Sequence, residues 1–207
     1  MPIAFPESLK GVTLWRYMGL EKLLGILQSR SLYFPQLRSF RDPYEGIVPI
    51  AWRGAVTDLS QLPDLLTSGG SAEWQEVNLS IPDGEHLRDQ NLPAELYVSC
   101  WHSNPHESAA MWSLYSRDNG IAIKTTSDLL ADALRDCRPS VQLAAVEYTD
   151  IVPGLLSGSP WSIKRPSFQH ENEIRAVIRD ADCKKAGVLV PVDLEALIQE
   201  IDRKSVV

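Results

Sequence analysis

The strand and helix patterns of this chain are short and irregularly ordered, and this order constrains the fold more than any other feature. Segments rich in β-branched and aromatic residues predict strands, and apolar residues recurring every three or four positions predict helices. No regular alternation of strand and helix runs along the chain, which argues against a doubly wound parallel sheet. The pattern predicts an α+β fold with mixed or antiparallel short-stranded sheets and flanking helices. The predicted strands cover residues 12–18, 31–35, 95–102, 120–126, 141–149, 172–178 and 187–192, and the predicted helices cover 19–30, 105–116, 127–137 and 193–201.

Three of these helices carry more specific expectations. Ser127 and Asp193 are expected to be N-caps, because their side-chain oxygens can accept hydrogen bonds from the first unpaired backbone N–H groups. In the helix at 19–30, four leucines have the spacing of one helical face and are expected to face the core. These are Leu20, Leu23, Leu24 and Leu27.

Length and composition predict a single domain in a reducing compartment. The chain has 207 residues, 44% of them apolar and 23% charged, as is usual for a soluble globular domain. No apolar run approaches the roughly 20 residues that a membrane-spanning helix needs. The first residues lack the basic-then-apolar plan of a signal peptide, and three scattered cysteines form no CxxC pair. We therefore expect a cytoplasmic protein without a disulfide framework.

The net charge of −7 is concentrated in one segment, residues 55–95. This segment holds eight acids and one base, whereas the rest of the chain holds 19 of each. It also contains Ser-Gly-Gly-Ser and several prolines, so we expect an acidic surface insertion, with a helix possible near 58–67, that could dock a basic protein partner. The charge balance argues against non-specific nucleic-acid binding.

Two glutamates at the start of a predicted strand, Glu171 and Glu173, are the leading candidates for a site. Successive strand side chains alternate between faces, so these two would stand on one side, roughly 7 Å apart. Like charges at that spacing repel unless water, Arg175 or a ligand compensates them. Either the strand presents an exposed ladder of charges that includes Arg175 and Arg179, or the glutamates form a site.

Other chemistry-bearing residues give weaker signals. Cys100, His102 and His106 lie close together, but Pro105 interrupts any helix between the histidines and no second ligand pair follows at zinc spacing. We expect no metal site, and we expect Cys100 to be a small buried strand residue rather than a nucleophile.

Two aromatic residues and two acids complete the candidates. Trp112 and Tyr115 share one face of the helix at 105–116 and favour a core role over a ligand platform. Asp42 and Glu45 favour a turn, with a polar role near a pocket as the alternative.

Three stretches taken together resemble a bacterial family called domain of unknown function 2971. They cover nearly the whole chain outside the acidic segment. The stretches are "LWRYMGLEKLLGILQSRSLYFPQLRSFRDPYEG", "YVSCWH…ESAAMWSLYS…GIAIKTT" and "KRPSFQHENEIRAVI".

More distantly, the order of motifs resembles the arginine–serine–glutamate class of ADP-ribosyltransferases. Arg16 stands on the first strand, Ser99 stands in a later strand, and Glu171 and Glu173 form an E-x-E motif entering another. The serine motif of that class is usually Ser-Thr-Ser, and here Cys100 and Trp101 follow Ser99. The resemblance implies an ADP-ribosyltransferase-like fold that uses NAD as a substrate.

The resemblance also implies a role for each motif residue. Glu173 would bond the ribose 2′-hydroxyl, and Glu171 would orient or deprotonate the acceptor. Because an oxocarbenium-like sugar develops when the nicotinamide–ribose bond breaks, a carboxylate beside the ribose would stabilise it.

The remaining motif residues would hold the cofactor. Arg16 would bind an NAD phosphate as a bidentate fork. Ser99 would brace the nicotinamide ribose or Glu173, and Trp112 or Tyr115 would form an aromatic wall for nicotinamide.

The function implied by the resemblance is ADP-ribosyl transfer to a macromolecular acceptor, as in a bacterial toxin, effector or defence protein. NAD glycohydrolysis, with water as the acceptor, would use the same site. A non-catalytic nucleotide-sensing module and a protein-interaction module that docks through residues 55–95 remain alternatives. A nuclease is disfavoured by the acidic balance and by the lack of a convincing metal-ligand set.

Overall fold

A computed structural model describes residues 6–40, 42, 95–116, 119–149, 160–180, 182 and 185–204. The acidic segment at 55–95, except for Glu95, lies outside the described residues, as do the helix expected near 58–67 and Glu45 of the predicted turn. Within the described part of the chain, no helix is long and apolar enough to cross a membrane.

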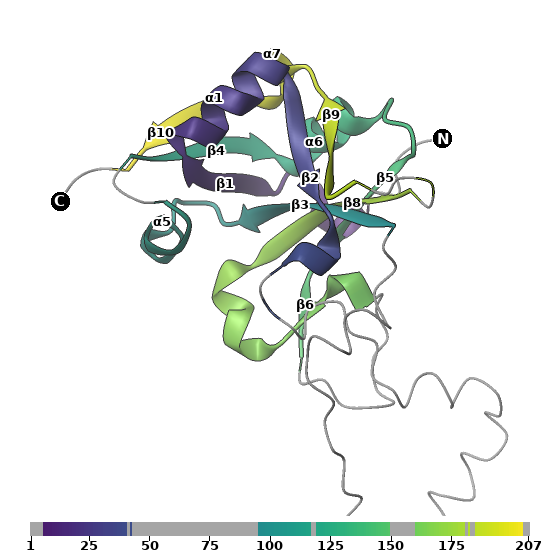
Figure 1. Ribbon diagram of the computed structural model, residues 1–207. Coiled ribbons are helices and arrows are strands. Elements are labelled where there is room, and N and C mark those ends of the chain that lie inside the picture. The colour runs from purple at the N-terminus through teal and green to yellow at the C-terminus, as the bar shows by residue number, and fades with distance from the viewer. Residues whose placement is uncertain are drawn as a thin grey trace, which may run out of the picture.

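The main element is a six-stranded sheet in which every neighbouring pair is antiparallel. Two small sheets accompany it, an antiparallel one of β2 and β9 and a parallel one of β6 and β7. This arrangement, with helices around it, confirms the α+β prediction (Figure 1). In sheet order the strands are β10 (Glu200–Arg203), β4 (Gly120–Thr126), β1 (Thr13–Gly19), β3 (Leu96–Ser103), β8 (Glu173–Arg179) and β5 (Val141–Ala145); the small sheets contain β2 (Ser31–Pro35), β9 (Gly187–Pro191), β6 (Glu147–Tyr148) and β7 (Ile163–Lys164).

The helices are short and sit mostly between strands. The caps confirm one prediction and correct another. Asp193 caps its helix by accepting from the backbone N–H groups of Glu195 and Ala196. Thr126, not Ser127, caps the helix that follows β4, because the Ser127 hydroxyl instead donates to the carbonyl of Leu9. The α-helices are α1 (Leu20–Ser29), α5 (Ala109–Tyr115), α6 (Ser127–Leu134) and α7 (Leu194–Leu197), and the 3-10 helices are η1 (Glu7–Leu9), η2 (Leu37–Ser39), η4 (Pro160–Ser162) and η5 (Pro166–Glu171).

The helix predicted at 193–201 is wrong in its second half. It ends at Leu197, and residues 200–203 form the edge strand β10 instead. The backbone N–H of Gln199 donates to the carbonyl of Lys124, which starts the antiparallel pairing with β4. Pairing with a strand about 75 residues earlier in the chain therefore overrides the local helical pattern.

The buried face of α1 also differs from the prediction. Leu23 and Ile26 are buried, whereas Leu20, Leu24 and Leu27 are 41%, 50% and 42% exposed. Leu23 and Ile26 are three residues apart and so lie on the same side of the helix. The dense run of leucines predicted the helix correctly but did not indicate which side of the helix faces the sheet.

One face of the main sheet carries the larger hydrophobic core. Helices α1, α6 and α7 and the small β2–β9 sheet cover this face (Figure 1). Their side chains pack on strand residues that alternate along the sheet, as successive strand side chains must. Examples are Leu14, Tyr97, Trp101, Ile123 and Ile174.

The opposite face carries two smaller apolar clusters. At one, α5 packs Met111 and Trp112 against Trp15 and Tyr17 of β1. At the other, η2 packs Leu37 near Leu96, Val98 and Val177 of β3 and β8. Polar side chains of β3 and β8 occupy the sheet positions between these two clusters.

Candidate functional site

The main sheet opens between its two central strands. β3 pairs with β8 at seven successive positions, from Leu96 to His102, but with β1 at only two, Leu14↔Ser103 and Trp15↔His102. Beyond Trp15 the two strands therefore separate. A cavity of about 780 Å³ lies there, lined by residues of β1, β3, α5, β7, η5 and the start of β8. We call it the carboxylate cavity.

Glu171 and Glu173 both line this cavity, although not as consecutive positions of one strand face. Glu171 is the last residue of η5, and Asn172 takes a left-handed conformation with φ 36° before β8 begins at Glu173. The predicted strand alternation is therefore wrong at Asn172. The two carboxylates nevertheless converge on one cation. The Lys164 ammonium donates to Glu173 Oε2 at 2.7 Å and also donates to Glu171 Oε2.

Arg175 completes an ionic cluster with Lys164 and the two glutamates. Its Nε and Nη2 donate to the Oε1 and Oε2 atoms of Glu173, at 2.8 and 3.3 Å. Lys164, Glu171, Glu173 and Arg175 are 7%, 6%, 5% and 0% exposed. The two cations balance the two anions inside the protein, as buried charges require.

The exposed-ladder interpretation of these residues is wrong. Glu171, Glu173 and Arg175 are buried, and β8 lies between β3 and β5 in the sheet, so these charges form neither an exposed face nor a solvated edge. Arg179 is the one member of the proposed ladder that lies outside; it is exposed and pairs with Glu95 at 2.9 Å.

The cluster keeps Glu173 ionised. Burial alone would raise the pKa of this carboxyl, but Arg175 and Lys164 outweigh burial and lower the pKa to about 2. Burial and the nearby Glu173 carboxylate raise the pKa of the Cys100 thiol well above its usual value. A thiol that stays protonated is a poor nucleophile, as expected for Cys100. The expected burial is wrong in part, because Cys100 is half-buried and lines the carboxylate cavity.

Tyr115 reaches the same cluster from α5. It is 48% exposed rather than part of the core, and its hydroxyl donates to Glu171 Oε1. Burial of the phenol and the bond to Glu171 raise the pKa of Tyr115. Trp112 is a core residue, 5% exposed, and its indole N–H donates to Glu107; it does not line the cavity.

Arg16 enters the cavity from the other face of the sheet. Its register partner on β4 is Ile123 of the main core, and its guanidinium lies 5.5 Å from the ring centroid of Trp101. Nη2 donates to the carbonyl of Tyr33 at 3.2 Å, while Nη1 is buried and has no hydrogen-bond partner among the described residues. Because arginine stays protonated in proteins, the N–H groups of Nη1 remain as unused donors on a residue that lines the cavity.

Ser99 does not line the cavity. It is fully buried, and its hydroxyl accepts a hydrogen bond from the Trp101 indole N–H at 3.1 Å. Trp101 in turn lies beside the guanidinium of Arg16. Ser99 thus supports the Trp101 ring beside Arg16, and within the described residues its side chain makes no hydrogen bond to either glutamate.

Lys164 is the residue of the site that the sequence did not indicate. It lies between Pro160 and Pro166, outside every predicted strand and helix, and no sequence pattern marks it as a site residue. Its position comes from β7, which pairs in parallel with β6 and turns the side chain toward β8. Arg165 and Asp42, joined at 3.0 Å, also line the cavity, which agrees with the pocket role considered for Asp42.

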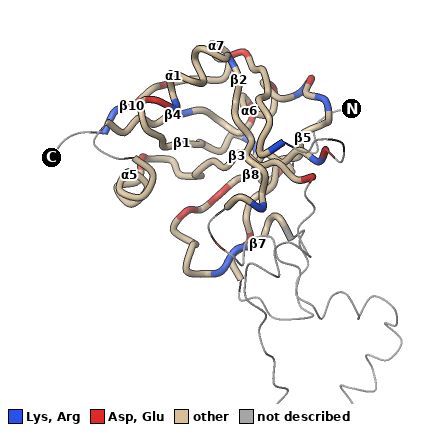
Figure 2. Tube along the Cα trace, viewed as in Figure 1, with Lys and Arg blue, Asp and Glu red and all other residues tan. Residues whose placement is uncertain are grey.

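The lining combines charge with aromatic surface. Four basic side chains (Arg16, Lys22, Lys164, Arg165) and three acidic ones (Asp42, Glu171, Glu173) face the cavity. Figure 2 shows acidic stretches of the trace near β8 and basic stretches near β7. Six phenylalanine, tyrosine and tryptophan rings join them: Trp15, Tyr17, Phe40, Trp101, Tyr115 and Phe168. The arrangement suits a ligand that has planar rings, hydroxyl groups and anionic groups.

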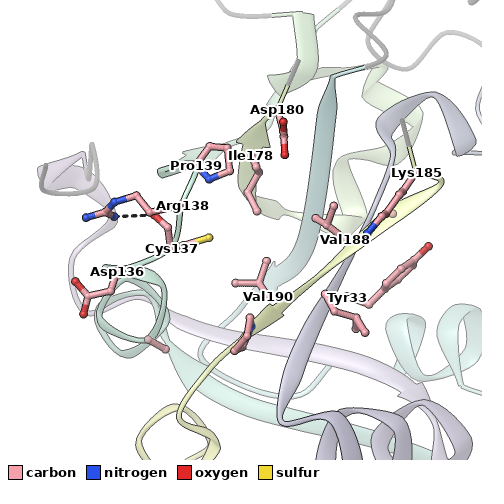
Figure 3. A pocket seen from close by; sticks show the side chains of 14 residues that line it. Tyr33, Asp136, Cys137, Arg138, Pro139, Ile178, Asp180, Lys185, Val188 and Val190 are labelled. Atoms are coloured by element: carbon pink, nitrogen blue, oxygen red, sulfur yellow. Dashed lines mark hydrogen bonds between the residues drawn. The ribbon is translucent and has the colours of Figure 1, made fainter. Parts of the chain in front are cut away.

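A second cavity, of about 800 Å³, lies by the end of α6 and β9 and shares no lining residue with the first (Figure 3). Its walls are largely apolar, from Ile178, Val188, Val190 and Pro139. Of its charged lining residues, Asp136, Arg138 and Lys185 are exposed and Asp180 is half-buried, so it offers no fully buried ionic group.

Within the described residues, no group of three or more histidine, cysteine or acidic side chains could hold a metal ion. No protein-family model matches the sequence, and no curated protein or solved structure matches the chain.

Proposed function

We propose that the protein binds NAD in the carboxylate cavity and transfers ADP-ribose to a macromolecular acceptor, within a fold of ADP-ribosyltransferase type. One observation carries the proposal: a buried pair of glutamates shares a cavity with an arginine whose Nη1 is unused, where β1 and β3 separate. The arginine and the E-x-E motif are two of the three signals on which the resemblance depends.

The proposed roles follow from charge and position. Arg16 donates from Nη1 to a phosphate oxygen of NAD, with Trp101 beneath its guanidinium. Glu173, ionised at neutral pH, accepts from the ribose 2′-hydroxyl and stabilises the positive charge on the sugar. Tyr115 supplies an exposed aromatic face at the mouth of the cavity, beside Glu171.

The reaction breaks the bond between the ribose C1′ and the nicotinamide nitrogen. The bonding electron pair leaves with nicotinamide, which becomes neutral, and a cationic ribosyl group remains opposite Glu173. A nucleophile, an arginine side-chain nitrogen or water, then forms a bond to C1′ and releases a proton toward Glu171 and solvent. With water as the nucleophile, the same steps give NAD glycohydrolysis.

Nicotinamide release from NAD, in the presence of host lysate, tests the proposal. Wild type is compared with Glu173→Gln and with Glu147→Gln, whose glutamate is exposed on β6 and does not line the cavity. We expect release by wild type and by Glu147→Gln, and a loss of at least a hundredfold in Glu173→Gln. Equal release by all three proteins would reject the assignment of Glu173.

A second candidate is a nucleotide-binding module without turnover. The observation that favours it is the engagement of Glu173: Arg175 donates to both of its oxygens and Lys164 donates to one. A carboxylate so occupied has little remaining capacity for a ribose hydroxyl. Saturable NAD binding by calorimetry, without nicotinamide release under any condition, would select this candidate over the transferase.

A further inference from the structure

His102, which lines the carboxylate cavity, carries a second buried polar atom that has no partner among the described residues. This residue is 4% exposed and lines the cavity on β3, directly opposite Glu173 in the antiparallel register with β8. Its ring lies near Tyr17, with centroids 6.1 Å apart. Its Nε2 is buried and makes no hydrogen bond within the described residues.

The other ring nitrogen fixes which tautomer is present. Nδ1 lies 2.5 Å from the backbone carbonyl oxygen of Glu171. A carbonyl oxygen only accepts hydrogen bonds, so Nδ1 must carry a hydrogen and donate it. In the neutral ring, Nε2 then has a lone pair and is an acceptor. A buried acceptor left without a donor costs free energy, and such atoms in native proteins call for an explanation.

We propose that His102 Nε2 accepts a hydrogen bond from the ligand of the carboxylate cavity, and that the ligand presents a hydroxyl or amide N–H there. This inference rests on the proposed function, and it adds a specificity-determining residue to it. Arg16 Nη1 offers a donor and His102 Nε2 an acceptor, from strands on the two sides of the opening. The cavity is thus prepared for a ligand carrying both an anionic group and a neutral donor.

The neutral donors of NAD are the ribose hydroxyls, the nicotinamide carboxamide and the adenine amino group, and the first two belong to the part of NAD that is proposed to lie beside Glu173. His102 stands opposite Glu173, which is proposed to hold the ribose, so either group can reach it. A third carboxylate or a cation in place of the histidine would disturb the charge balance of Lys164, Arg175 and the two glutamates. A neutral acceptor does not.

Two substitutions separate the two nitrogens of the ring. The amide N–H of an asparagine can take the place of Nδ1–H and keep the bond to the Glu171 carbonyl, but it has nothing at the Nε2 position. A glutamine places its amide near Nε2 and gives up the Nδ1 bond. His106→Asn is the matched control, because His106 is exposed and does not line the cavity.

The first readout is spectroscopic and needs no activity. The ring nitrogens of ¹⁵N-histidine-labelled wild type are followed by NMR while NAD, ADP-ribose or nicotinamide is added, with His102 assigned from the spectrum of His102→Asn. We expect the Nε2 signal of His102 to move as NAD binds. If the signal moves with ADP-ribose but not with nicotinamide, the donor is a ribose hydroxyl. If it moves with nicotinamide but not with ADP-ribose, the donor is the carboxamide.

The second readout is affinity. We expect His102→Asn to bind NAD about tenfold more weakly than wild type, and His102→Gln to recover part of that loss. NAD binding that leaves the Nε2 signal and the affinity of His102→Asn unchanged would overturn the inference and leave the proposed function standing. A moving Nε2 signal without nicotinamide release would support the inference and reject the transferase. Absence of binding by all three ligands would reject both.

Discussion

Removal of Lys164 should expose how much the protein depends on the ionic cluster. Lys164 is the cation that touches both glutamates, and all four members of the cluster are less than a tenth exposed. Substitution by methionine keeps most of the aliphatic stem, which can still pack beside Phe168. Within the described residues, it leaves two buried carboxylates with Arg175 to balance them.

The expected cost is about 3–5 kcal/mol of unfolding free energy, the range for removing one partner of a buried ion pair. The cost should depend on pH, because protonation of one glutamate relieves the unbalanced charge. In wild type, Lys164 is one of two cations that lower the pKa of Glu173, so this pKa should rise in Lys164→Met. The penalty should therefore be largest at pH 7 and should shrink as the pH falls toward 4.

Urea unfolding of wild type and Lys164→Met at pH 7 and pH 4 measures this. Lys22→Met is the control, since Lys22 lines the same cavity but is exposed, and its cost should stay within about 0.5 kcal/mol. The double variant Lys164→Met with Glu171→Gln should recover part of the loss even if the single variant is too unstable to study. A penalty below about 1 kcal/mol, or one that does not change with pH, would refute the reasoning.

Three further predictions concern Glu173, Arg16 and Asp193. The pKa of Glu173 is lowered in the folded state from 4.5 to about 2, so the ionised carboxylate stabilises the fold above about pH 4.5 and this stabilisation is lost as the pH falls toward 2. The lost free energy of unfolding is on the order of 3 kcal/mol. Acid unfolding of Glu173→Gln should show no such pH-dependent loss. Arg16→Lys should weaken NAD binding by at least tenfold in calorimetry, because an ammonium cannot both contact the Tyr33 carbonyl and donate two parallel hydrogen bonds to a phosphate. The melting temperature should change by no more than a few degrees. Unchanged affinity for NAD would remove Arg16 from the site. Asp193→Ala should cost about 1 kcal/mol in urea unfolding through loss of the N-cap of α7, whereas Asp193→Asn should cost much less.

Local sequence patterns predicted the fold well where neighbouring residues decide the outcome. The strands near residues 13–19, 31–35, 120–126 and 187–191 follow β-rich runs, and α1 follows a dense run of leucines. Predictions were wrong where distant contacts decide. β10 is a strand because β4 offers it an edge, and Ser127 is not a cap because its hydroxyl is committed to Leu9.

The candidate site divides in the same way. Glu171, Glu173 and Arg16 were found from motifs, and the fold brings them to one cavity. Ser99 and Trp112, found by the same reasoning, lie outside its lining. Lys164 could not be predicted, since its contact with the glutamates depends on the path of β7. The unused Nε2 of His102 is a property of packing, which a sequence does not display.

The most direct test of the central claim is nicotinamide release by wild type and Glu173→Gln at NAD concentrations that saturate both, as established beforehand by calorimetry. Saturation removes any difference in binding, so the comparison isolates the step at the ribose. The account predicts release by wild type and a loss of at least a hundredfold in Glu173→Gln, with NAD binding retained. Equal rates in the two proteins, or no release by wild type with NAD bound, would contradict it.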